Sequence, residues 1–202
     1  MIPSLTNLNG NPLAVVDVET TGRVGGFHEI VQIAIVPLTL DLELAEDIQP
    51  FYQNIRPTYP ERAEKKAEGV HGLVMDDLLL NAPTQERVLD YLLEWFQNLP
   101  LGHGRRLTPI AHNWGFERSF LTHWLGPELM NNIFTPHPRD TMILCSMLND
   151  RASLLGEVPP FKYVGLEYVC KLMGVPLENA HNALEDSVAT ARLYSALMRA
   201  IL

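Results

Sequence analysis

The chain has 202 residues, a formal net charge of −9 and a 47% share of hydrophobic residues. This length and apolar share are enough for one complete core, so we expect a single domain over residues 13–202 behind a polar arm over residues 1–12. The negative charge excludes a broad basic surface for gripping nucleic acid, but it leaves open an acidic site that binds divalent metal.

The sequence lacks the features of membrane and secreted proteins. No window approaches about 18 uninterrupted apolar residues, the length that a membrane-spanning helix needs. Residues 1–12 lack the basic and apolar regions of a secretory signal. Cys145 and Cys170 have no metal-type spacing, so we expect buried free thiols. These observations predict a cytoplasmic protein with no membrane partner.

Strands are predicted where short runs rich in β-branched residues occur, at residues 13–18, 30–37, 51–55 and 107–111. The first two runs are joined by a glycine-containing loop, which suggests a hairpin. The charged segment 57–72 is expected to be loosely structured, with Lys65 and Lys66 facing water.

Helices are predicted from apolar residues at helical spacing and from capping residues. Pro83 introduces the first helix, with Thr84 as its N-cap. The second is expected to end at Gly126 and Pro127. After the first, the expected helices cover residues 116–125, 140–148, 166–173 and 182–202. Strands come early and then alternate with helices, which predicts an α/β domain with a mixed central sheet flanked by helices.

Two acids interrupt the apolar strand AVVDVETTG. Side chains alternate along a strand, so Asp17 and Glu19 are expected to share one face, with Val18 on the other. An Asp-x-Glu pair is common by chance, and taken alone it says little about function. The pair becomes informative only together with acids further along the chain.

A third acid lies in the segment AHNWGFERSFLTHWLG. Glu117 is followed at positions i+3, i+4 and i+7 by Phe120, Leu121 and Trp124, so it belongs to the apolar stripe of a helix. An ionised carboxylate on such a stripe costs several kcal/mol unless it is paired or binds a metal. The alternative is that Glu117 lies at the edge of the stripe, where it reaches solvent or pairs with an arginine.

The last acid of interest lies in the segment HNALEDSVATARLY. Asp186 shares its helix face with Ala189, Thr190 and Leu193, and small neighbours on this face would let another group approach closely. His181 comes five residues earlier, roughly 140° around a continuous helix, so we place it on the loop before the helix. From there it could reach a site that Asp186 lines. The alternative is a surface histidine beside an N-cap asparagine.

Four convergent carboxylates would repel one another unless cations neutralised them. The four are Asp17, Glu19, Glu117 and Asp186. Oxygen ligands suit Mg²⁺ or Mn²⁺, and no Cys/His cluster in the sequence supports zinc. Two such cations about 3.5–4 Å apart form a clamp for in-line displacement at phosphorus. A neutral histidine such as His181 can accept the proton of the attacking water at physiological pH. The sequence therefore predicts two-metal hydrolysis of a phosphodiester.

Three motifs, in this order, resemble those of a known family. DVETTG near the N-terminus, AHNWGFERSFL in the middle and HNALEDSVATARLY at the end are similar to the three motifs of the DEDDh 3′–5′ exonucleases. This superfamily includes the epsilon proofreading subunit of DNA polymerase III, ribonuclease T and oligoribonuclease. The resemblance runs from about Leu13 to the C-terminus. It implies a ribonuclease H-like fold, with a mixed five-stranded sheet and flanking helices.

Carried over position by position, the resemblance implies that Asp17 bridges both metals, that Glu19 binds one of them and that Asp186 is the last ligand. His181 would be the general base, because its spacing to Asp186 marks the h subtype. Asp140 matches an aspartate that often precedes a helix in the family. We interpret it as an N-cap and not as a ligand.

Glu117 departs from the family, which usually has an aspartate there. The extra methylene moves the carboxylate by at most about 1.5 Å, and a misplacement of about 1 Å near the chemistry can lower a rate about a hundredfold. In the family this residue reaches the second metal largely through water, so the longer side chain could be absorbed. The departure bears on the affinity for the second metal more than on the existence of the site.

The resemblance implies a metal-dependent 3′–5′ exonuclease that acts on single-stranded or frayed DNA and releases nucleoside 5′-monophosphates. DVETTG is nearer to the epsilon pattern, which favours DNA, with a DNA polymerase or another replication protein as a candidate partner. One alternative is an exoribonuclease that trims RNA 3′ ends, which needs contacts to the 2′-OH. Another is a polymerase-associated binding module whose catalysis is impaired by Glu117. Phe27, Phe51 and Trp114 could stack on terminal bases, although core packing is the commoner role.

Overall fold

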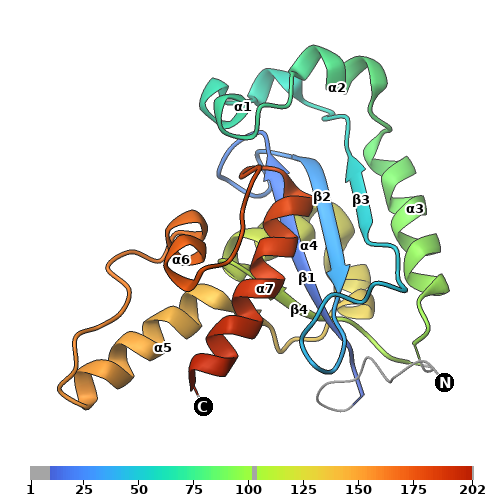
Figure 1. Cartoon of the computed structure of the whole chain (residues 1–202). Helices are drawn as coiled ribbons and strands as arrows, with labels where there is room; N and C mark the ends of the chain where they lie inside the picture. Colours follow the sequence, from blue (N-terminus) through green and yellow to red (C-terminus); the bar gives the residue numbers. More distant parts are fainter. Residues whose placement is uncertain (1–9, 102–103, 202) are drawn as a thin grey trace.

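The computed structural model describes residues 10–101 and 104–201. A five-stranded sheet forms its centre (Figure 1). The strands are β1 (Leu13–Thr20), β2 (Ile30–Pro37), β3 (Phe51–Asn54), β4 (Thr108–Ala111) and β5 (Arg139–Asp140), in the spatial order β3-β2-β1-β4-β5. Residues 1–9, most of the predicted arm, lie outside the described residues. The division into an arm and a single domain stays a prediction.

The sheet is mixed, as predicted. β1 pairs antiparallel with β2, and β2 with β3, so the expected hairpin is confirmed. β4 pairs parallel with β1, and β5 parallel with β4. The sequence does not predict β5, because two residues are too few to show a pattern. Parallel strands end at the same edge of a sheet, so the segments that leave β1 and β4 emerge near each other.

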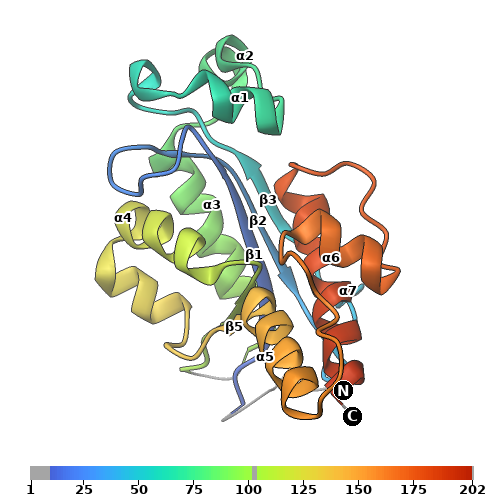
Figure 2. The same cartoon turned by 90° about the vertical axis from the view of Figure 1, so that its left-hand side faces the viewer.

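Helices cover both faces and one end of the sheet. They are α1 (Lys65–His71), α2 (Met75–Asn81), α3 (Gln85–Asn98), α4 (Trp114–Ile133), α5 (Thr141–Leu154), α6 (Leu166–Met173) and α7 (Ala183–Ile201). α3 and α4 lie against one face, and α5, α6 and α7 lie on the other (Figure 2). α1 and α2 stand at the end where β1 finishes. This arrangement confirms the predicted α/β class.

The alternation of side chains along β1 decides what each face of the sheet carries. Val16 and Val18 belong to the core cluster that includes buried residues of α3 and α4. Val15 belongs to a different cluster, formed with α7. The odd-numbered positions of β1 therefore face α7, and the same face continues to Asp17 and Glu19.

The segment that was expected to be loosely structured forms a 3₁₀ turn (Pro60–Arg62) followed by α1, and α2 comes soon after. α1 buries no residue completely, and α2 buries only Leu78. Neither helix therefore has the wide apolar stripe by which a helix is recognised in a sequence. Lys65 and Lys66 are exposed, as expected.

α4 runs past its predicted end. Gly126, with φ 74° and ψ 162°, interrupts the helical backbone, but Pro127 starts a further helical stretch that reaches Ile133. Glycine and proline thus mark a kink at this place. α5 also extends beyond the expected residue 148, whereas α6 has the predicted bounds.

The described residues contain no helix that is long and apolar enough to cross a membrane. Cys145 and Cys170 are free and buried, as predicted. Burial raises the pKa of Cys145 to about 11 and that of Cys170 to about 12. Both thiols therefore stay protonated at neutral pH and act as small apolar side chains.

The carboxylate of Asp140 caps the N-termini of two helices, α4 and α5. Its carboxylate accepts hydrogen bonds from the N–H groups of Met142 (2.9 Å) and Ile143 (3.4 Å) in α5, which confirms the predicted N-cap. The same carboxylate accepts from the N–H groups of Asn113 (3.3 Å) and Trp114 (2.8 Å) at the start of α4. One negative charge therefore satisfies donors at two positive helix ends.

Asp140→Ala should lower the free energy of unfolding by about 2 kcal/mol or more, because it removes two caps that contribute about 1 kcal/mol each. Asp140→Asn should cost less, since its amide keeps one acceptor oxygen. Urea denaturation measures both changes. The matched control is Asp150→Ala, at an exposed position of α5, with an expected change below about 0.5 kcal/mol. An Asp140→Ala protein as stable as this control would contradict the shared cap.

Candidate active site

Asp17 and Glu19 lie near the end of β1, on the face that α7 covers. Both are partly buried, whereas Val18 between them is buried in the core on the opposite side. The strand ends one residue after Glu19, at Thr20. β1 thus presents two carboxylates in one direction at the rim of the sheet, as the alternation predicts.

Asp186 reaches this pair from the first turn of α7, where it is 8% exposed. Ala191 and Tyr194 of α7 pack with residues of β1 and β2, which brings the start of the helix over the end of β1 (Figure 1). One carboxylate oxygen from each of Asp17, Glu19 and Asp186 lies within 4.8 Å of the other two. Such a group of three acids can hold a metal ion.

The pKa of each of the three acids is raised above its ordinary value. Burial is the main reason why the pKa of Asp17 stands well above its usual range, and the charges of Glu117, Glu19 and Asp186 raise it further. Burial, followed by the charge of Asp186, raises the pKa of Glu19 to about 7. Burial also raises the pKa of Asp186, against the opposing effects of the backbone N–H and side chain of His181. A divalent cation would reverse these shifts by neutralising the charges that repel one another.

Glu117 lies in the first turn of α4 and is 3% exposed, so the expected position on an apolar stripe is confirmed. Burial is the main reason why its pKa is well above the usual range. After burial, the charge of Glu117 is the next largest cause of the raised pKa of Asp17. Glu117 is not one of the three acids within 4.8 Å of one another. The structure therefore brings three predicted acids together and leaves the fourth at their edge.

Two buried carboxylate oxygens, Oε2 of Glu117 and Oδ1 of Asp186, have no hydrogen-bond partner among the described residues. An anionic oxygen that is buried and unpaired costs free energy, so it calls for a positive ligand. All the donors here are oxygens, which suits Mg²⁺ or Mn²⁺. The residues present therefore fit the divalent cations that the sequence predicts.

His181 lies on the loop before α7, where the sequence analysis places it, and its side chain is exposed. Its backbone has a left-handed φ of 70°. Its N–H donates to Oδ2 of Asp186 at 3.1 Å. The backbone of the histidine is thus tied to the acid cluster, while the imidazole stays accessible to a substrate.

A pocket of about 400 Å³ opens beside Glu19. Lys66, Val70 and His71 of α1 contribute to its wall, and Phe116 of α4 lies on another side. Burial is the main reason why the pKa of His71 is lowered, so this imidazole is neutral at physiological pH. His71 is missed at the sequence level because α1 is not predicted, so nothing places it near the acids. The only local signal in the sequence that could have drawn attention to His71 is its place just before Gly72, the glycine that ends α1.

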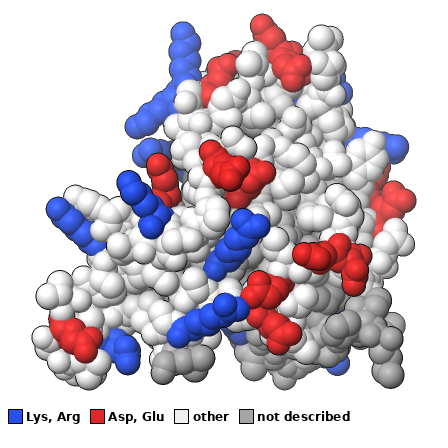
Figure 3. Space-filling view, in the orientation of Figure 1, with Lys and Arg blue, Asp and Glu red and all other residues white. Residues whose placement is uncertain are grey.

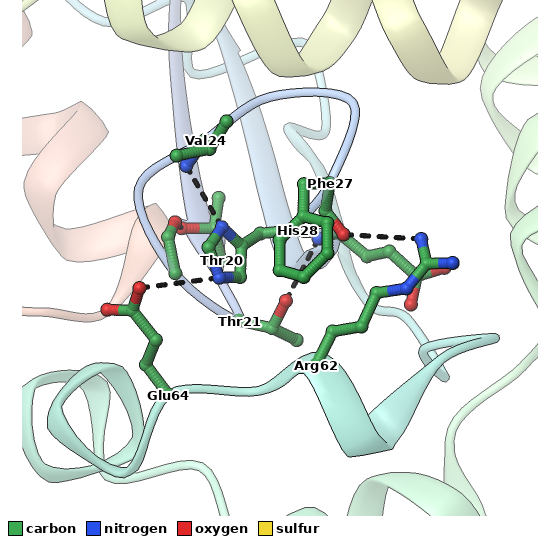
Figure 4. Close-up of polar contacts among 9 residues, drawn as sticks. Thr20, Thr21, Val24, Phe27, His28, Arg62 and Glu64 are labelled. Atoms are coloured by element: carbon green, nitrogen blue, oxygen red, sulfur yellow. Dashed lines mark hydrogen bonds and ion pairs between the residues drawn. The ribbon is translucent and has the colours of Figure 1, made fainter.

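The loop between β1 and β2 is held close to α1 (Figure 4). The N–H of Val24 donates to Nδ1 of His28 at 3.0 Å, and Nε2 of the same ring lies 3.4 Å from a carboxylate oxygen of Glu64. The imidazole lies so close to Gly22 that a side chain at position 22 would collide with it. These contacts explain why position 22, the last residue of DVETTG, is a glycine. They also connect the β1–β2 loop to the segment that leads into α1, and both segments line the pocket.

The aromatic candidates for base stacking are mostly in the core. Phe51 and Trp114 are buried, so core packing is their role. Phe27 is exposed, and the guanidinium of Arg62 lies 5.3 Å from its ring centroid (Figure 4). Phe116, which the sequence analysis did not single out, lines the pocket beside the acids.

Comparison with protein families decides what kind of enzyme carries this site. The model of the RNase_T family, described as exonuclease, matches residues 14–194. The chain belongs to this exonuclease family. Membership confirms the identification made from the three motifs, the DEDDh 3′–5′ exonucleases, and the predicted enzyme class.

Relatives of this exonuclease include two bacterial polymerases. DNA polymerase III PolC-type of Staphylococcus epidermidis is 28% identical over 197 residues, which is 95% of this chain and 12% of that protein. The PolC-type polymerase of Staphylococcus aureus is 28% identical over 185 residues, which is 89% of this chain and 11% of that protein. The chain therefore spans about an eighth of the length of the curated relatives that it matches.

Two solved structures resemble the exonuclease in fold. The nuclease domain of 3′hExo, a DEDDh family member bound to rAMP, has a TM-score of 0.67 and 19% identity, and the match covers 93% of this chain and 92% of that one. Escherichia coli Exonuclease I in complex with a dA16 oligonucleotide has a TM-score of 0.70 and 16% identity, with coverage of 93% and 40%. These likenesses confirm the predicted ribonuclease H-like fold.

Glu19→Gln should stabilise the exonuclease at about pH 8 in a chelator and change its stability little at about pH 5. The pKa of Glu19 is about 7 in the folded protein, against about 4.3 in an unfolded chain. Folding therefore favours the protonated acid, and the stability that this contributes at low pH is lost as the pH rises through about 7.

Thermal unfolding midpoints at the two pH values measure the effect. Glu157→Gln, at an exposed position after α5, is the matched control and should change neither midpoint. Equal midpoints for the wild type and Glu19→Gln at about pH 8 would show that Glu19 ionises as freely as a surface acid.

Proposed function

We propose that this exonuclease removes nucleotides from the 3′ end of single-stranded or frayed DNA with two divalent cations, Mg²⁺ or Mn²⁺. The proposed cation ligands are Asp17, Glu19, Glu117 and Asp186. His181 would be the general base. The observation that carries the proposal is the group of three carboxylates within 4.8 Å of one another, at the edge of an open pocket.

Each acid has a distinct proposed role. Asp17 would bridge the cations, as the family resemblance implies, and the charges of the other three acids all act on it. Glu19 and Asp186 approach it from β1 and from α7, and each would bind one cation. Glu117 lies outside the group of three, so it would reach the second cation through water. Its buried Oε2 supports this role, because a solvated surface acid would not leave an oxygen unpaired.

Cations bound there would activate a water molecule and offset the negative charge that develops on the phosphate. The oxygen of this water would form a bond to the phosphorus of the last phosphodiester, while the bond from phosphorus to the 3′ oxygen of the preceding nucleotide would break. His181 takes the proton from the water, and the departing 3′ oxygen takes one from solvent. The products are a nucleoside 5′-monophosphate and a strand that is one nucleotide shorter.

The surface around the pocket carries side chains of both charges. On the face drawn in Figure 3, positive side chains project where α1 lies, and acidic ones gather over the N-terminal part of α7. Lys65 and Lys66 of α1 are exposed, and Lys66 lines the pocket, so they can contact phosphates near the 3′ end. Similarity to PolC-type polymerases across 95% of the chain favours DNA, and a DNA polymerase as partner.

The test is hydrolysis of 3′-labelled single-stranded DNA and RNA in Mg²⁺, Mn²⁺ or a chelator. The expected result is release of labelled 5′-monophosphate from DNA in either metal and none in the chelator. Asp17→Asn, which removes the bridging ligand, should abolish the release and serves as the control for contaminating nucleases. Full activity in the chelator, strict zinc dependence or release from the 5′ end would contradict the proposal.

Two further outcomes of the same assay favour the alternatives. Faster hydrolysis of RNA than of DNA would make the chain an exoribonuclease, in line with the rAMP bound to 3′hExo. A folded protein that binds the strand and hydrolyses neither substrate would be a binding module with impaired catalysis.

His181→Ala should lower kcat by about 10²–10⁴-fold, the usual effect of losing a general base. The metal concentration for half-maximal rate should change little, because His181 is not a proposed ligand. The matched control is His137→Ala, an exposed histidine before β5, which should keep the wild-type rate. A wild-type kcat in His181→Ala would show that His181 is a surface histidine without a catalytic role. A large rise in the metal concentration for half-maximal rate would show that it is a metal ligand.

Glu117→Asp should keep the activity or raise it, because it restores the reach that is usual in the family. Glu117→Ala should lower the rate by about a hundredfold and raise the metal concentration for half-maximal rate. Glu128→Ala, an exposed acid further along α4, is the control. If Glu117→Ala behaves like this control while the enzyme still needs Asp17 and Asp186, the centre has three carboxylates.

A further inference from the structure

A buried amide stands directly beside the acid cluster and takes no part in it. Gln32 of β2 is the ladder partner of Glu19 of β1 and, on its other side, of Asn54 of β3. It is 1% exposed, so the N–H groups and the carbonyl oxygen of its amide must find partners inside the protein. The partners that satisfy them lie on β3 and at the start of α7.

Both N–H groups and the carbonyl oxygen of the Gln32 amide have a partner. Oε1 accepts from the backbone N–H of Ala183 at 2.8 Å. Nε2 donates to the hydroxyl of Tyr52 at 2.9 Å and to Oδ1 of Asn54 at 2.8 Å. A backbone N–H can only donate, so the orientation of the amide is fixed. The Tyr52 hydroxyl also accepts from Nδ2 of Asn182 at 2.9 Å.

Side-chain hydrogen bonds satisfy the N–H groups at the start of α7, which have no partner within the helix. Oδ1 of Asn182 accepts from the N–H groups of Leu184 (3.1 Å) and Glu185 (3.3 Å), and Gln32 accepts from that of Ala183. The first three N–H groups of α7 thus have side-chain partners, two from Asn182 and one from the neighbouring strand. His181 directly precedes this segment.

The conformation of His181 depends on its neighbours. A residue with a Cβ rarely adopts a left-handed backbone, and His181 does so with φ 70°. The next residue, Asn182, donates a hydrogen bond to the hydroxyl of Tyr52. The backbone N–H of His181 itself donates to the carboxylate of Asp186. The loop residue is thus fixed between a strand-anchored amide and a carboxylate of the cluster.

We propose that Gln32 and Tyr52 are positioning residues for His181: they anchor Asn182 and the N-terminus of α7, and thereby hold the histidine where it can take the proton of the attacking water. The inference rests on the proposed function, because it takes His181 as the general base. Neither residue lines the pocket beside the acids. The body of α7 packs on β1 and β2 through Ala191 and Tyr194, so the loss of these bonds loosens residues 181–184 and leaves Asp186 in place with the rest of the helix.

The test is a double-mutant cycle between position 32 and position 181. Gln32→Met keeps the size of the side chain and removes all three hydrogen bonds. It should lower kcat by about ten- to a hundredfold and leave KM and the metal requirement within about twofold. In a His181→Ala background the same substitution should change kcat by less than about twofold, because the group that it positions is already gone.

Tyr52→Phe is a milder second variant, because it removes one hydroxyl from a partly buried side chain. It should lower kcat in the same direction and show the same lack of additivity with His181→Ala. The matched control is Gln53→Met, the same exchange one position further along β3. Gln53 is partly buried and lies outside this set of bonds, so its variant should keep the wild-type kcat.

Amide hydrogen exchange gives a readout that does not depend on activity. Exchange at Ala183 and Leu184 should accelerate in Gln32→Met and stay unchanged in Gln53→Met, while exchange in the middle of α7 stays unchanged in both. Equal losses of kcat from Gln32→Met with and without His181 would overturn the inference, as would unaltered exchange at Ala183. If His181→Ala alone has the wild-type kcat, the proposed function fails first, and the two failures are thus distinguishable.

Discussion

The removal of four clustered carboxylates from water, together with the repulsion between their charges, is the constraint on which this structure depends. Three of them lie within 4.8 Å of one another, and a fourth is buried at their edge. Burial and the neighbouring charges raise the pKa of all four, so each would hold its proton more tightly than a surface acid. An arrangement with this free-energy cost is expected only where a ligand offsets it, and divalent cations bound by oxygen do so directly.

The fold reduces this cost with helix ends. Glu117 and Asp186 both lie in the first turn of a helix, where the partial positive charge of the N-terminus favours an anion. Each of these helix ends is held by a side chain from a different element. Asp140 caps α4 from the end of β5, and Gln32 accepts from the first N–H of α7. The acids are therefore presented by rigid elements, which is what a site with a tolerance of about 1 Å requires.

The sequence predicts what depends on local periodicity. The alternation along β1 gives the common face of Asp17 and Glu19, and helical spacing gives the burial of Glu117. It does not predict α1, because this helix has no wide apolar stripe, and so the pocket wall with His71 is missed. The bond between Gln32 and Ala183 joins residues 151 positions apart, and no local pattern reports such a contact. That the acids come together in space is predicted from the order of the motifs, through the family resemblance. Local periodicity alone does not predict it.

The most direct test of the central claim is anomalous diffraction from crystals of the full chain grown with Mn²⁺ and a nucleoside 5′-monophosphate. The account predicts two manganese peaks about 3.5–4 Å apart, with Asp17 as a ligand to both and the phosphate between them. It also predicts Glu19 and Asp186 as ligands, with Glu117 directly bound or linked through water. No manganese at this end of β1, or a single ion that Asp17 does not touch, would contradict the account.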